Sequence, residues 1–229
     1  MRILALDTAT EACSAALLEE AQLRVRELPP GPAHSSHILG LIRELLEEAG
    51  LDLADLDCIA FGRGPGAFTG VRLAASVTQG LAFGAGLKVV PVSDLLALAQ
   101  QALDLEPTAG SALVCNDARM QEVYWACAVR GPGGLALAAG PEQVGPPERV
   151  RLPEGLPAPT VAVGRGFAVW PELGRDRRLA ALPIQADLLP RAREIARLAV
   201  PQWQAGWALD AQQAQPVYLR NDVAKPSRK

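Results

Sequence analysis

The chain has 229 residues with a formal net charge of −3, and 49% of them are hydrophobic although only 4% are aromatic. A chain of this kind can bury an aliphatic, alanine-rich core, and its charge excludes an overall basic surface for nucleic acid. Its four cysteines form no C-x-x-C pair, and no apolar run has the length of a signal sequence or a membrane span, so we expect a cytoplasmic protein without a zinc ribbon.

The first hundred residues alternate short apolar runs with amphipathic stretches, which predicts an α/β fold. We expect a β-hairpin from residues 3–6 and 12–18, and a third strand at 25–28. A helix should follow over 36–49, capped by Ser35 or Ser36 and ended by Gly50.

A glycine-rich stretch follows the strand predicted at 59–61 and precedes a helix predicted at 69–85. This arrangement can present backbone N–H groups to an anion, or it can only let the strand turn tightly into a packed helix. The stretch lacks the lysine of a Walker A loop. It fits G-x-G-x-x-A through Gly62, Gly64 and Ala67, but Pro65 lies inside it and no acidic residue has the spacing of a dinucleotide site. We therefore favour the structural interpretation.

The second half of the chain repeats features of the first. A strand at 89–92 and a helix capped by Ser93 complete a first lobe, 1–108. In the second lobe, 109–229, Asp117 ends a strand 110 positions after Asp7, and Gly164 follows a strand 102 positions after Gly62. We interpret this as a duplicated lobe. The helix expected at 192–200 is assigned to the shortened second lobe, and the tail from Pro216 is expected to begin as a strand and to end in a basic, mobile segment.

Two groups of residues could carry chemistry. His34 and His37 could share a metal ion, but no third ligand is evident, which favours solvated or capping histidines. Asp7 and Asp117 could hold a Mg²⁺–nucleotide between the lobes, or each could cap a turn, and the second interpretation is favoured. The weak candidates for cofactor binding are Asp7, Thr8, Gly64, Gly66 and Asp117; no catalytic residue is predicted.

Four stretches, in order along nearly the whole chain, carry a resemblance: ILALDTATEACS (3–14), GRGPGAFTGVR (62–72), DARMQEVYWA (117–126) and PVYLRN (216–221). They resemble the bacterial TsaB (YeaZ) family. The resemblance implies two related lobes of the actin/Hsp70/sugar-kinase (ASKHA) type, the second shortened. It also implies a non-catalytic role in making N6-threonylcarbamoyladenosine (t6A) at position 37 of tRNAs that read ANN codons.

The resemblance further implies partners. The subunit would bind and activate the paralogous transferase TsaD, together with the ATPase TsaE, and would meet tRNA indirectly. ATP and Mg²⁺ would act only at the level of the complex. The H-x-x-x-H pair of TsaD-type proteins is missing here, which fits a subunit without catalysis. The alternative is an ASKHA-type ATP-binding phosphotransferase or ATPase that uses Asp7 and Asp117.

Family members pair through the two long helices of the first lobe, here 36–49 and 69–85. The small residues of the second helix would let a partner helix approach closely, and an exposed apolar helix face predicts a homodimer when the partner is absent. The residues expected to bind the partner are Ile38, Leu41, Leu45, Val71, Ala74, Ala75, Thr78 and Leu81.

Overall fold

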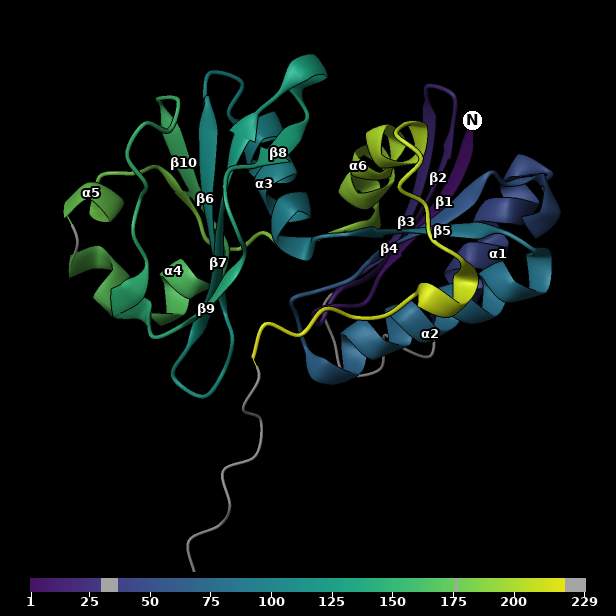
Figure 1. Cartoon of the computed structure of the whole chain (residues 1–229), viewed down its shortest axis with the longest axis horizontal. Helices are drawn as coiled ribbons and strands as arrows, with labels where there is room; N and C mark the ends of the chain where they lie inside the picture. The colour runs from purple at the N-terminus through teal and green to yellow at the C-terminus, as the bar shows by residue number, and fades with distance from the viewer. Residues whose placement is uncertain (30–36, 176, 221–229) are drawn as a thin grey trace, which may run out of the picture.

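The computed structural model describes residues 1–29, 37–175 and 177–220 as two lobes side by side, each built on one β-sheet (Figure 1). In the first sheet the strand order is β3-β2-β1-β4-β5. The three N-terminal strands are antiparallel, and β4 and β5 continue the sheet parallel to β1. The strands are β1 (Arg2–Asp7), β2 (Cys13–Glu19), β3 (Gln22–Leu28), β4 (Cys58–Gly62) and β5 (Lys88–Val92).

The second sheet repeats this order and these directions. Its order is β11-β10-β6-β7-β8, so that β6 corresponds to β1, β7 to β2, and β10 to β4. The expectation of an α/β protein with two related lobes of the ASKHA type is confirmed. The strands are β6 (Ser111–Asp117), β7 (Val123–Arg130), β8 (Ala136–Ala138), β10 (Thr160–Val163) and β11 (Ile184–Gln185), and β9 (Gln143–Gly145) pairs with β7.

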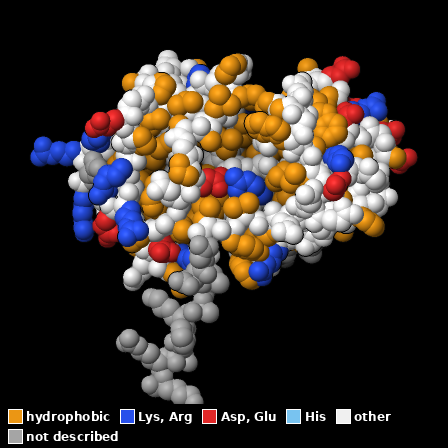
Figure 2. All heavy atoms as spheres, in the orientation of Figure 1, with side chains coloured by type: hydrophobic (Ala, Val, Ile, Leu, Met, Phe, Trp, Pro, Cys, Tyr) orange, Lys and Arg blue, Asp and Glu red, His pale blue; other side chains and the backbone are white. Residues whose placement is uncertain are grey.

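The lobes differ in their helices, because the helices of the second lobe are shorter than those of the first. In the first lobe, α1 (Ile38–Ala49) covers β2 and β3, and α2 (Phe68–Ala85) covers β4. The second lobe has only α4 (Gly166–Val169) and α5 (Arg177–Ala180) in the corresponding region. The short 3₁₀ segments are η2 (Leu53–Asp55), η3 (Pro132–Gly134), η4 (Pro147–Arg149), η5 (Pro171–Arg175) and η6 (Ala211–Gln213). Figure 2 shows Lys and Arg side chains gathered at the outer edge of this lobe, where Figure 1 places α5.

The remaining helices exchange sheets. The helix α3 (Asp94–Leu105) follows the first sheet but packs on β6, β7, β8 and β10. The helix α6 (Ala192–Gln204) follows the second sheet but packs on β1, β2, β4 and β5, and it contacts α3. The assignment of this last helix to the second lobe was therefore wrong. The exchange occurs because the first sheet has a second apolar face, with Ile3, Ala5 and Val90 fully buried, which α6 covers.

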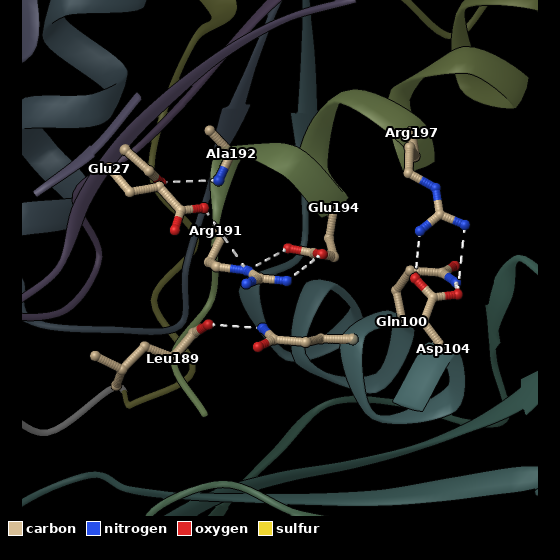
Figure 3. A network of polar contacts seen from close by, with 10 residues as sticks. Glu27, Gln100, Asp104, Leu189, Arg191, Ala192, Glu194 and Arg197 are labelled. Carbon is tan, nitrogen blue, oxygen red and sulfur yellow. Dashed lines mark hydrogen bonds and ion pairs between the residues drawn. The ribbon is translucent and has the colours of Figure 1, made fainter. Parts of the chain in front are cut away.

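Polar contacts tie α3 and α6 to each other and to the first sheet (Figure 3). Arg197 of α6 pairs with Asp104 of α3. The guanidinium of Arg191 binds both carboxylate oxygens of the buried Glu194 at 3.0 and 2.7 Å. Because both charges of this pair are held together, Glu194 can lie inside the apolar contact between α6 and the sheet.

The chain then returns across the first lobe. Residues 207–220, the C-terminal strap, run from the edge of β5 along α2 to the second lobe. Leu209 bridges Val89, and Val217 N–H donates to the carbonyl of Arg63 at 2.8 Å. Arg220 then pairs with Glu122 at 2.5 Å. The strand expected from Pro216 does not form, since the strap is extended but meets no free sheet edge there. The basic end beyond residue 220 lies outside the described residues.

Helix ends follow local signals. Gly50 ends α1 with φ 66°, and Ser93 Oγ accepts from Leu96 N–H at the start of α3. The start of α1 differs from the expected capping, since the helix begins at Ile38 and the side chain of His37 makes no capping hydrogen bond. His34, Ser35 and Ser36 lie outside the described residues. No helix of the described residues combines the length and the hydropathy needed to cross a membrane.

Candidate functional site

The glycine stretch after β4 is packed against the turn between β1 and β2. A Cβ atom on Gly66 would lie 2.5 Å from the carbonyl oxygen of Ala9, and one on Gly70 would overlap that of Thr8. The hydroxyl of Thr8 donates to the carbonyl of Gly70 at 2.7 Å, and Ala67 N–H donates to the carbonyl of Ala9 at 2.7 Å. These glycines are needed because two backbone segments meet here.

Two further N–H groups of the stretch have partners within the chain. Arg63 N–H donates to the carbonyl of Val92 at 2.9 Å, and Gly64 N–H donates to the carboxylate of Asp94. Asp94 N–H in turn donates to the carbonyl of Gly64 at 3.1 Å. A phosphate cradle needs N–H groups that point freely at the ligand. The N–H groups of Arg63, Gly64 and Ala67 are not free in this way, which supports the structural interpretation for this part of the stretch.

Asp7 and Asp94 form a buried carboxyl pair. Asp7 is 2% exposed and Asp94 is 0% exposed, and their side chains hydrogen-bond to each other. Burial raises the pKa of Asp7 to about 6. Burial and the neighbouring charge of Asp7 raise the pKa of Asp94 well above its usual value. Burial therefore favours a form of the pair that keeps a proton, in which one carboxyl can donate to the other.

The outer oxygens of the pair hold the backbone. Asp7 Oδ1 accepts from Ala9 N–H at 2.5 Å, and Asp94 accepts from Gly64 N–H. Among the described residues, Asp7 Oδ2 and Asp94 Oδ1 have no partner beyond this carboxyl pair. A shared proton between them satisfies both oxygens, whereas Mg²⁺ prefers ionised carboxylates.

Asp117 has separate partners in the second lobe. Its Oδ1 accepts from Arg119 N–H at 3.1 Å and from Trp170 Nε1 at 3.3 Å, and its Oδ2 lies 3.2 Å from the Arg119 guanidinium. Asp7 and Asp117 thus each cap the turn that follows their strand, as the favoured interpretation predicted. No group of three or more His, Cys, Asp or Glu side chains in the described part of the chain could hold a metal ion.

The residues expected to bind a partner lie mostly inside the first lobe. Seven of the eight are at most 7% exposed, since the broad apolar faces of α1 and α2 pack on their own sheet. The prediction that these seven side chains contact a partner is therefore corrected, while Leu81 is half-buried. The seven are Ile38, Leu41, Leu45, Val71, Ala74, Ala75 and Thr78.

The opposite face of α2 is open. Phe68 and Phe83 are 55% and 67% exposed at its two ends, and Ser76, Gly80 and Gly84 are exposed between them. A Cβ atom on Gly80 or Gly84 would meet nothing within 4 Å. The fold of the chain itself therefore does not need glycine at these positions.

Comparisons with known proteins agree on one family. The profile of the family described as "TsaD: tRNA N6-adenosine threonylcarbamoyltransferase" matches residues 31–170. The "tRNA threonylcarbamoyladenosine biosynthesis protein TsaB" of Escherichia coli K12 is 41% identical over 98% of this chain and 96% of its own. Its Haemophilus influenzae counterpart is 38% identical over 97% and 95%. The chain belongs to the TsaB (YeaZ) family. The solved structure "YeaZ from Pseudomonas aeruginosa" superposes with a TM-score of 0.84 at 44% identity, over 95% of this chain and 99% of that one.

One residue of this TsaB-family chain escaped the sequence analysis. Asp94 follows the cap Ser93 at the first position of α3, where an acidic residue is common because of the helix dipole. It stands too far along the chain from the glycine stretch to match the spacing of a dinucleotide site. Only the parallel pairing of β4 with β5, which brings the start of α3 beside Gly64, shows that Asp94 belongs to this region.

Proposed function

We propose that this TsaB-family chain is a non-catalytic subunit of the machinery that makes t6A in tRNA. Membership of the family supports a role in t6A biosynthesis. The finer proposal is that the chain binds a TsaD-type paralogue through the outer face of α2 and activates it in the cytoplasm, together with a TsaE-type ATPase.

The chemistry of the strand ends supports a role without catalysis. Burial disfavours the ionised forms of Asp7 and Asp94, and Asp117 is engaged by Trp170 and Arg119. Neither carboxyl is poised to hold a Mg²⁺–nucleotide. The backbone N–H groups of Arg63, Gly64 and Ala67 are also bound within the chain.

The outer face of α2 is the observation that carries the proposed pairing. It combines two exposed aromatic rings with exposed small residues, and Arg72 is the only charged residue of the helix. Two glycines within a helix cost about 1 kcal/mol each relative to alanine. Since the monomer does not use the space at Gly80 or Gly84, a partner helix packed closely against them explains their presence.

A pairing experiment tests this proposal. We expect Ser76→Arg and Gly80→Leu each to weaken the complex with a TsaD-type paralogue about tenfold or more, measured by calorimetry. The matched control is Gln143→Arg, at an exposed position on β9 of the second lobe. Undiminished pairing by both α2 variants would rule out this face as the interface.

The same face supports a homodimer of the lone chain. Light scattering over a dilution series should show a dimer that dissociates on dilution, and Ser76→Arg should remain a monomer throughout. Substitutions at Ala75 or Thr78 would be uninformative, because these buried side chains would disrupt the core instead of the surface.

A further inference from the structure

Four exposed arginines of the second lobe make no ion pair with another described residue. Elsewhere, arginine side chains such as Arg24, Arg63, Arg165 and Arg197 pair with carboxylates. These four exposed residues of the second lobe are here called the arginine face. They are Arg149 of η4, Arg151, Arg175 of η5 and Arg177 of α5.

These four residues are held on one surface by a small core. The segment η4 packs on η5, and η5 packs on α5. Val150, Leu173 and Leu179, each at most 3% exposed, anchor the three segments beneath the arginines. The charges are thus fixed near one another by packing, and Figure 2 shows basic side chains at this edge with acidic side chains among them.

The charge of the chain is segregated along the sequence. Residues 146–180 contain six arginines and four acidic residues, whereas the rest of the chain contains 16 basic and 21 acidic residues. Like charges placed together repel one another, so a cationic surface on an acidic protein carries an energetic cost. The composition of the chain alone does not explain such a surface.

We propose that the arginine face binds the phosphate backbone of a structured RNA. Guanidinium groups donate paired hydrogen bonds that match phosphate oxygens. Contacts of this kind position an RNA without reading its sequence. The choice of RNA over other polyanions rests on the proposed function, since the relatives of this chain are named for threonylcarbamoyladenosine in tRNA.

The position of the face is compatible with the proposed pairing. In Figure 1, α5 lies at the outer edge of the second lobe, and α2 lies on the first lobe. A protein partner on α2 therefore leaves the arginine face open, and one chain can hold a protein partner and an RNA at the same time.

Fluorescence anisotropy with an unmodified tRNA transcript, over a salt series, tests the proposal on the full chain. Arg149→Gln combined with Arg175→Gln should weaken binding about tenfold and lower the salt slope by about one for each arginine removed. The control, Arg26→Gln combined with Arg43→Gln on the first lobe, removes the same charge and should change neither quantity. Equal melting temperatures would verify that all variants fold.

Three results would overturn the proposal: no binding of tRNA by the unaltered chain, equal weakening in the two double variants, or equal competition by polyglutamate. The last result would assign the face to an acidic protein. Failure of the proposed pairing is a separate outcome, because Ser76→Arg should abolish pairing on α2 and leave the affinity for tRNA unchanged.

Discussion

At the scale of single residues, the carboxyl pair of Asp7 and Asp94 connects three segments of the first lobe. Asp7 ends β1, Asp94 begins α3, and their outer oxygens bind the N–H groups of Ala9 and Gly64. Two buried carboxyls at hydrogen-bond distance cannot both ionise without a large cost in desolvation and repulsion. The proton that they share is therefore part of the folded structure.

This proton makes the stability depend on pH. Both folded pKa values are raised, so the folded chain holds more protons than the unfolded one between pH 3.8 and about 6 for Asp7, and over a range that begins at the same pH for Asp94. Stability from the pair is greatest at the acidic end of this window and falls as the pH rises. We expect the free energy of unfolding to fall by on the order of 2 kcal/mol between about pH 5 and pH 8, measured with urea.

Asp94→Asn should remove most of the pH dependence of the free energy of unfolding. The amide can donate to Asp7 and still accept from Gly64 N–H. The exposed Asp187→Asn is the control and should retain the full decline. A variant at Asp94 that declines as steeply as the original chain would show that another group is responsible.

At the scale of elements, α2 contains glycines with opposite requirements. Gly70 lies at its first turn, where a Cβ atom would overlap the carbonyl oxygen of Thr8. Gly80 lies in its middle, with open space outside it. Gly70 lets the helix pack against the β1–β2 turn, whereas Gly80 lies on the exposed surface of the helix.

The same substitution at the two sites should therefore have opposite effects. Gly70→Ala should lower the free energy of unfolding by about 2–3 kcal/mol through overpacking against backbone. Gly80→Ala should raise it by up to about 1 kcal/mol, since alanine is the better helix former. Denaturant unfolding of the two variants provides the comparison, and destabilisation by Gly80→Ala would contradict the assignment of an unused surface.

The elements also show where sequence reasoning succeeds and where it ends. Strands, helices and caps such as Ser93 and Gly50 were predictable because they depend on neighbours in the chain. The sequence did not predict which side of α2 packs on its own sheet. Both sides carry small apolar residues, and only the packing distinguishes the buried Ala75 from the exposed Gly80. Asp94 and α6 were misjudged for the same reason, since their partners are distant in sequence.

At the scale of the whole molecule, the exchange of α3 and α6 makes the lobes depend on each other. The first sheet needs α6 from near the end of the chain, and the second sheet needs α3 from the first half. The connection is strengthened by Arg63, whose guanidinium binds both oxygens of Glu142 in the second lobe at 3.0 and 3.1 Å.

Truncation should reveal this dependence. A chain that ends at residue 190 lacks α6 and leaves one apolar face of the first sheet uncovered, so we expect it to lose cooperative thermal unfolding, measured by circular dichroism. A chain that ends at residue 220 keeps every described element and should melt like the full chain. A cooperative transition in the shorter chain would show that the first lobe closes without α6.

The exchange of helices also bears on how the protein is made. A ribosome releases the first sheet early, but the helix that covers its inner face is translated almost last. Until then Ile3, Ala5 and Val90 belong to a surface that other nascent chains can meet. This surface stays uncovered from the synthesis of β5 until the synthesis of α6. Chaperones that bind the surface, and proteases that remove incomplete products, would act during that time.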